Sequence, residues 1–219
     1  MEADKAPFPP AKVANAVQAL LASVPRLRDD AHMPPPPEIR ALIDAIADAG
    51  RDVQGAAFMR LCALTEVPPA WAPGVWSELL ALLDHRNHRT RAIAGQLLAR
   101  IAPATAVATV VADLPRLIAA TRDPQFVTGR HILQALARLG TAPPEVRARL
   151  AALLAARFVA CAGEKNATLI RFDIQTVLRA LHDRADDEGE ATRMRQGALD
   201  LVLHEPDPKY ARKYLGCWK

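Results

Sequence analysis

The chain has 219 residues, of which 51% are hydrophobic, 24% are charged and only 5% are aromatic. This apolar content excludes a fully disordered chain, and the length suits one domain or one short array of repeats. The formal net charge of +4 tolerates an acidic partner without requiring one. Alanine and leucine are abundant, whereas β-branched and aromatic residues are few, so the composition predicts an all-α fold.

Several features predict a soluble cytoplasmic protein that does not associate with a membrane and binds no cofactor. The first residues carry acidic side chains and early prolines, and they do not resemble a signal peptide. The most apolar run, residues 150–162, contains Arg157 and is too short to span a bilayer. The cysteines Cys62, Cys161 and Cys217 form no CxxC pair, which indicates reduced thiols rather than disulfides or a zinc site.

Residues 1–37 are expected to form an N-terminal capping helix and a proline-rich linker. Apolar residues recur every three or four positions within 11–24, as one face of a helix requires. Residues 34–37 are four consecutive prolines, which favour an extended backbone. We interpret this run as a stiff linker, and the alternative is a polyproline-II ligand for a partner domain.

Residues 38–219 are predicted to form a repeat array with a basic C-terminal cap. Amphipathic segments alternate there with short breaks that contain glycine, aspartate or proline. The predicted helical pairs are 38–49 with 53–64, 73–83 with 89–101, 107–120 with 125–139, 144–160 with 166–182, and 188–203 with 209–215.

The second helices of the first four pairs share one apolar pattern, at offsets of 37, 38 and 42 residues. The shared columns are Ala57, Ala94, Ile132 and Ile174, then Leu61, Leu98, Leu136 and Leu178, then Leu64, Ile101, Leu139 and Leu181. A single helical pair cannot bury both of its faces, but stacked pairs create a continuous core. The repeated pattern therefore predicts an α-solenoid of about five pairs.

The clearest units are HRTRAIAGQLLARIA at 88–102 and RDPQFVTGRHILQALARLG at 122–140, and the turns carry Asp52, Asp84 and Asp123. With these features the array resembles the HEAT-repeat family, including its short bacterial members, over roughly residues 38–205. The fourth unit has a longer turn and the fifth has a truncated second helix. The resemblance implies a right-handed superhelix whose second helices line a concave surface. Family members mostly act as protein-binding scaffolds, whereas some bind nucleic acid and a few are enzymes.

Six arginines on the second helices form the main candidate site, a basic ladder for an acidic protein surface or peptide. They are Arg91, Arg100, Arg130, Arg138, Arg171 and Arg179. If they face the concave groove, their guanidinium groups can bind carboxylates or phosphates by charge-assisted hydrogen bonds. The alternative is a solvated face whose arginines pair with acids such as Asp84, Asp123 and Asp173.

Aromatic and basic residues form a second candidate contact surface. Its members are Trp71, Trp76, Lys209, Tyr210, Arg212, Lys213, Tyr214 and Trp218. Rings interleaved with cations can bind nucleic acid by stacking and charge, and an exposed tryptophan pair can be a binding hot spot. The alternatives are a plug between repeats for the two early tryptophans and a terminal cap for the tail.

Signatures of enzymes are absent from the sequence, which has no GxGxxG, GxSxG, HExxH or phosphate-loop motif. His85 and His88 beside Asp84 could hold a metal ion, but polar turn residues are the favoured interpretation. No catalytic residue is assigned. The predicted function is a non-enzymatic protein-binding scaffold, and the alternative is nucleic-acid binding related to DNA repair. A HEAT-like DNA glycosylase or a bilin lyase is a third hypothesis.

Overall fold

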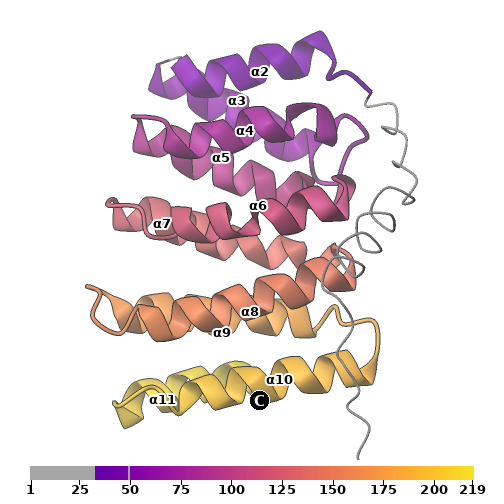
Figure 1. The fold of residues 1–219 in the computed structure, drawn as a ribbon. Helices are drawn as coiled ribbons and strands as arrows, with labels where there is room; N and C mark the ends of the chain where they lie inside the picture. The colour runs from indigo at the N-terminus through magenta and orange to yellow at the C-terminus, as the bar shows by residue number, and fades with distance from the viewer. Residues whose placement is uncertain (1–32, 49) are drawn as a thin grey trace, which may run out of the picture. The chain divides into compact units, whose positions relative to one another are not determined.

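The computed structural model describes residues 33–48 and 50–219, so the predicted capping helix at 11–24 lies outside the described residues. The described part of the chain is all-helical, without strands, and its helices pack against one another (Figure 1). The predicted all-α class is therefore confirmed. Residues 33–36 are not helical, and Pro37 already begins the first described helix, where its missing N–H group costs no hydrogen bond.

The helices follow the predicted segments closely. Their bounds are α2 Pro37–Asp48, α3 Arg51–Leu64, α4 Trp76–Ala81, α5 His88–Ile101, α6 Val107–Ala120, α7 Phe126–Ala135, α8 Pro144–Ala160, α9 Ala167–His182, α10 Glu188–Val202 and α11 Pro208–Leu215. In two of the predicted helices, 73–83 and 125–139, part of the segment forms 3-10 turns instead of α-helix. Such turns flank α4 at Ala72–Val75 and Leu82–Asp84, and another follows α7 at Leu136–Thr141.

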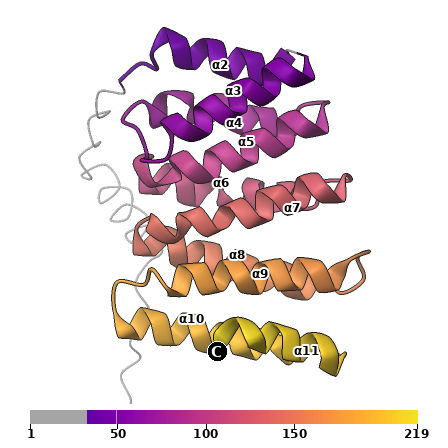
Figure 2. The same cartoon turned by 180° about the vertical axis from the view of Figure 1, so that it is seen from behind.

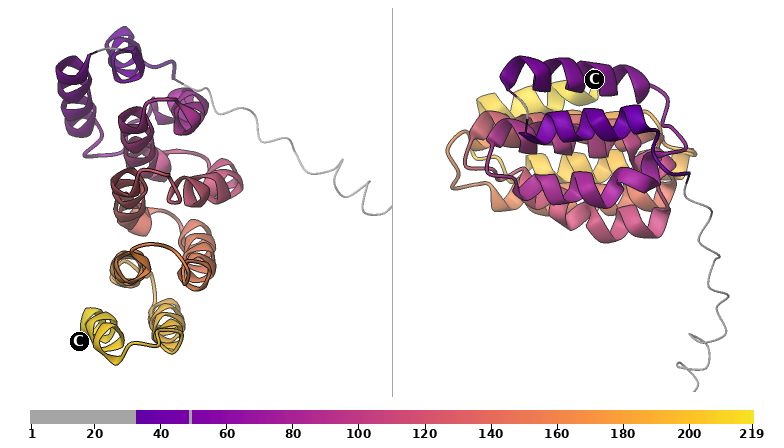
Figure 3. Two further views of the ribbon diagram at one scale, coloured as in Figure 1. Left: turned by 90° about the vertical axis from the view of Figure 1, so that its left-hand side faces the viewer. Right: turned by 90° about the horizontal axis from the view of Figure 1, so that it is seen from above.

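The helices lie in two rows, which Figure 3 shows end-on. Helices α3, α5, α7, α9 and α11 contact one another in succession, and we call them the second-helix row (Figure 2). On the other side α6, α8 and α10 contact one another in succession (Figure 1). Each row thereby gives the other a long apolar interface.

The three apolar columns of the second helices lie in the core between the rows. Every member is buried except Leu64, which is partly buried against the same core. Burying a leucine or isoleucine side chain contributes about 1.5–3 kcal/mol, so these columns are a principal source of stability. The spacing of three and four residues thus predicted the inward face of each second helix correctly.

No helix within residues 33–48 and 50–219 has the length and apolar character needed to cross a membrane. Cys62, Cys161 and Cys217 are free thiols. Burial raises the pKa of all three thiols above the usual value, which disfavours the reactive thiolate form.

Candidate ligand-binding face

All six arginines of the basic ladder form ion pairs. The pairs are Arg91–Asp123, Arg100–Glu66, Arg130–Asp173, Arg138–Glu66, Arg171–Glu205 and Arg179–Asp183. Only the last of these pairs is local in sequence, because Asp183 directly follows the end of α9. Asp84, the other acid considered as a partner, bonds Arg116 instead. An acidic ligand at these arginines therefore has to compete with acids of the chain itself.

Arg91 of α5 bonds the turn before α7, and Arg130 of α7 bonds α9. Arg91 donates from Nε and Nη2 to the Asp123 carboxylate at 2.5 and 2.9 Å, and Arg130 bonds Asp173 of α9 at 2.6 and 3.2 Å. Burial alone would raise the pKa of Asp123, but the hydrogen bonds from Arg91 hold that pKa below its usual range. Both arginines thus serve as clamps between neighbouring pairs.

Arg171 is the most deeply placed of the six, with a side chain that is only 6% exposed. Its Nη1 donates to Glu205 at 2.8 Å and its Nε donates to the Phe158 carbonyl at 3.2 Å. Glu205 also accepts a hydrogen bond from the Tyr214 hydroxyl at 3.1 Å. This cluster ties α9 to the C-terminal helix and leaves little of Arg171 for a ligand.

Arg100 and Arg138 share one acid at the C-terminal ends of α5 and α7. Both bond Oε2 of Glu66, at 3.2 and 3.4 Å. The hydrogen bond from Arg100, together with the charge of Arg138, lowers the pKa of Glu66. The three side chains line a hollow of about 870 Å³, to which Asp183 and Arg184 also contribute. This hollow carries cations and acids in nearly equal number.

A second hollow of the second-helix row, of about 760 Å³, lies at the N-terminal ends of α3, α5 and α7. Among the described residues no aspartate or glutamate lines it, whereas Arg51, His88, Arg89 and His131 do. We call this hollow the basic groove. Phe58 and Val127 add apolar surface to its wall. It combines positive charge with apolar side chains in one depression.

Arg51 and Arg89 differ from the ladder in their partners. Within residues 50–219 neither of them forms an ion pair. The Arg89 guanidinium extends toward α3, because its Nη2 lies 3.0 Å from the place where a Cβ atom on Gly55 would stand. Arg89 lies on the same second helix as Arg91 and Arg100, but neither Arg89 nor Arg51 is one of the six arginines of the predicted ladder. No sequence pattern separates them from the paired ones, since pairing depends on which acids the fold brings close.

The two early tryptophans lie in the core. Trp76 is 2% exposed, and its indole Nε1 donates to Asp113 of α6 at 2.8 Å. Trp71 is buried beside it in the turn before α4. Both rings therefore fill the space where the second pair begins, and neither presents a face to solvent.

The C-terminal tail divides into buried rings and exposed cations. The Tyr214 hydroxyl donates to the Thr168 carbonyl at 3.0 Å, and the Trp218 indole donates to Gln175 Oε1 at 2.7 Å. Both rings are buried against α9 and cover the end of the second-helix row. The exposed cations of the tail segment in α11 are Lys209, Arg212 and Lys213, and Tyr210 is half-buried.

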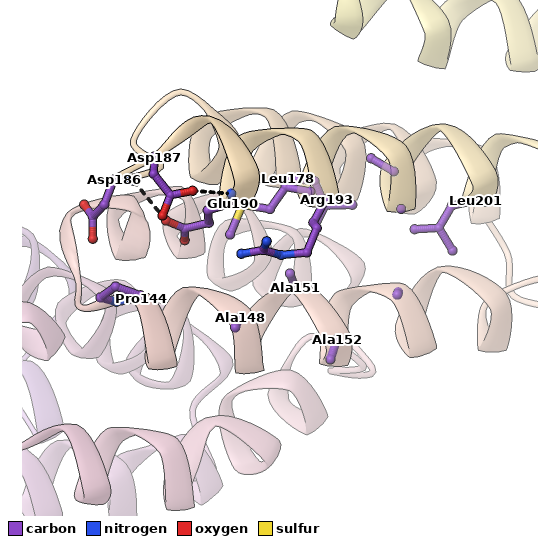
Figure 4. A pocket seen from close by; sticks show the side chains of 14 residues that line it. Pro144, Ala148, Ala151, Ala152, Leu178, Asp186, Asp187, Glu190, Arg193 and Leu201 are labelled. Carbon is purple, nitrogen blue, oxygen red and sulfur yellow. Dashed lines mark hydrogen bonds between the residues drawn. The ribbon is translucent and has the colours of Figure 1, made fainter.

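Another hollow, of about 510 Å³, lies between α8 and α10, and alanines of α8 form much of one wall (Figure 4). Acids gather at one end of it, but they are already bonded within the chain. Asp187 Oδ1 accepts from the Glu190 amide at 2.7 Å and caps α10, and the Glu190 carboxylate accepts two hydrogen bonds from buried Arg147. The acids therefore support the start of α10.

Within residues 33–48 and 50–219, no group of three or more His, Cys, Asp or Glu side chains is placed to hold a metal ion. The His85 ring beside α5 accepts a hydrogen bond from the Asn87 amide at 3.1 Å. Comparisons with protein-family models, with curated proteins and with solved structures found no match to this chain. The geometry of the second-helix row is therefore the main indication of function.

Proposed function

We propose that the chain is a non-enzymatic scaffold that binds an acidic segment of a partner protein. In this proposal the two rows of helices form a right-handed, HEAT-like solenoid, and the second-helix row carries the ligand. The observation that supports it most is the basic groove, where two arginines without an acidic partner among residues 50–219 line a depression free of described acids. Charge left unneutralised in a hollow favours an anionic ligand.

The apolar wall of the groove favours a protein ligand. Phe58 and Val127 stand among the cations, and Val127 is 60% exposed. A protein segment that alternates acidic and apolar side chains would match both kinds of surface, since aromatic and arginine side chains supply much of the energy at interfaces.

The basic groove also gives the better target for mutation. Reversing Arg91 or Arg171 to glutamate would place a second acid beside Asp123 or Glu205 in a largely buried position, and the protein would lose stability. Arg51 is exposed and Arg89 is half-buried, so charge reversal there changes the ligand face with little effect on the fold.

The test is an affinity capture from source-cell lysate with the wild-type chain, the Arg51→Glu/Arg89→Glu variant and a control. The control, Arg149→Glu/Arg195→Glu, makes the same change in net charge at two exposed arginines of α8 and α10. We expect one partner protein to be retained by the wild type and the control, lost by the groove variant, and unaffected by nuclease. Equal capture by all three forms would refute the proposal.

Nucleic-acid binding is the second candidate function, and the cations of α11 favour it. Lys209, Arg212 and Lys213 are exposed, and the helix sequence PKYARKYL contains no acid. Binding to a labelled oligonucleotide should then weaken steeply as salt is raised, because contacts to phosphates release counterions. Binding that is insensitive to salt, or absent at low salt, would rule this function out.

A further inference from the structure

We infer that the basic groove recognises a phosphomonoester, carried by a phosphorylated side chain of the partner segment. This inference rests on the proposed function and specifies the chemistry of its ligand. It depends on the charge of the groove, on the spacing of its two arginines and on the donors around them.

The charge of the groove matches a dianion better than a single carboxylate. Arg51 and Arg89 supply two positive charges, and no described acid lines the hollow to neutralise them. A phosphorylated serine, threonine or tyrosine carries a charge of about −1.5 to −2 at pH 7, whereas one aspartate or glutamate carries about −1. A single phosphoryl group therefore matches the charge of both arginines, which one carboxylate does not.

The Arg89 guanidinium reaches the helix that carries Arg51. The Arg89 Nη2 lies close over Gly55, which is four residues after Arg51 in α3. Residues four apart on a helix stand on neighbouring turns of one face, about 5–6 Å between their Cβ positions. The missing side chain at Gly55 lets the Arg89 guanidinium approach the surface of α3. An anion bound in the hollow that both arginines line would be attracted by both of their charges.

Further hydrogen-bond donors line the basic groove near the two arginines. Three helices begin at the groove, at Arg51, His88 and Phe126, and the first and third lack a side-chain cap at the preceding residue. The N-terminal ends of these helices add positive potential on the same side of the groove. The His88 and His131 rings line the same hollow and can donate to phosphoryl oxygens. These groups support the arginines, which carry the inference.

The experiment measures fluorescence anisotropy with the full chain and short labelled peptides of leucine, glutamate and glycine. Three peptides differ only at a central residue, which is phosphoserine, serine or glutamate, and a short oligothymidylate provides phosphodiesters. We expect the phosphoserine peptide to bind about tenfold or more tightly than the serine peptide, and clearly more tightly than the glutamate peptide. Arg51→Ala/Arg89→Ala should abolish this preference, and Arg149→Ala/Arg195→Ala should keep it.

The outcomes separate this inference from the proposed function. Equal affinity for the phosphoserine and glutamate peptides, with both lost in the groove variant, would overturn the phosphate inference and leave the acidic-segment scaffold standing. A phosphoserine preference that survives Arg51→Ala/Arg89→Ala would place the site elsewhere and overturn the inference. Tighter binding of the oligothymidylate through the same two arginines would overturn it in favour of nucleic acid. Circular dichroism of each variant checks that the helices are retained.

Discussion

Two glycine-to-alanine substitutions in helix interiors should have opposite effects on stability. Gly197 lies inside α10, and a Cβ atom added there would meet nothing within 4 Å. Gly129 lies inside α7, and its added Cβ would stand 2.6 Å from the Thr121 carbonyl oxygen and 3.0 Å from the carbonyl carbon. Helix propensity alone predicts that both substitutions stabilise the protein, by about 0.5–1 kcal/mol.

The environment of Gly129 makes the alanine substitution destabilising at that position. The contacted atoms belong to the backbone of a turn that is held by hydrogen bonds, since the Thr121 amide and hydroxyl both donate to the Ile118 carbonyl. Overpacking of this kind costs about 1–3 kcal/mol, so Gly129→Ala should lose about 1–2 kcal/mol after the gain in propensity. Gly197→Ala should keep the gain of about 0.5–1 kcal/mol.

Urea denaturation followed by circular dichroism measures both free energies of unfolding. In thermal melts the midpoint should rise by about 1–4 °C for Gly197→Ala and fall by about 2–8 °C for Gly129→Ala. The two variants carry the same chemical change in helices of the same chain, so each controls for the other. If Gly129→Ala proved as stable as Gly197→Ala, the reasoning that α7 packs too closely on the Thr121 turn to accept a Cβ atom would be refuted.

Two further predictions concern buried polar contacts. Trp76→Phe should lower the free energy of unfolding by about 2 kcal/mol, because it removes the indole hydrogen bond to Asp113. If Trp76→Phe kept wild-type stability while Asp113→Asn was destabilised, the role of this hydrogen bond would be contradicted. The hydrogen bonds from Arg147 lower the pKa of Glu190, so this carboxylate stabilises the folded state above its unfolded pKa and loses that contribution as the pH falls through its folded pKa. Glu190→Gln should therefore be less stable than the wild type by about 2–4 kcal/mol at pH 7, and the difference should shrink as denaturation is repeated below about pH 4. A difference that does not change with pH would show that the Glu190 charge is not responsible.

The helices and their inward faces followed from local sequence. The 107–120 and 144–160 segments were predicted with the bounds that the structure has, because apolar spacing, proline and alanine content act within a few turns. The 73–83 and 125–139 segments differ in detail. Their ends tighten into 3-10 turns, at Leu82–Asp84 and Leu136–Thr141, where packing against α5 and α9 sets the backbone.

The candidate site could be predicted from the sequence only in part. Periodicity placed Arg91 and Arg130 on the second helices, but their partners Asp123 and Asp173 lie 32 and 43 residues away. A local pattern carries no information about contacts at that separation, so it could not distinguish these arginines from Arg51 and Arg89. The same holds for Trp76 and Trp218, whose buried hydrogen bonds depend on residues of other helices.

The helical class, the positions of the helices and their inward faces follow from local sequence, because those properties depend on neighbours within one or two turns. Which cations are neutralised and which remain for a ligand depends on how the helices pack in three dimensions. An ion pair needs two side chains within hydrogen-bonding distance, and that proximity arises when helices pack side by side. The basic groove at Arg51 and Arg89 is a product of that packing.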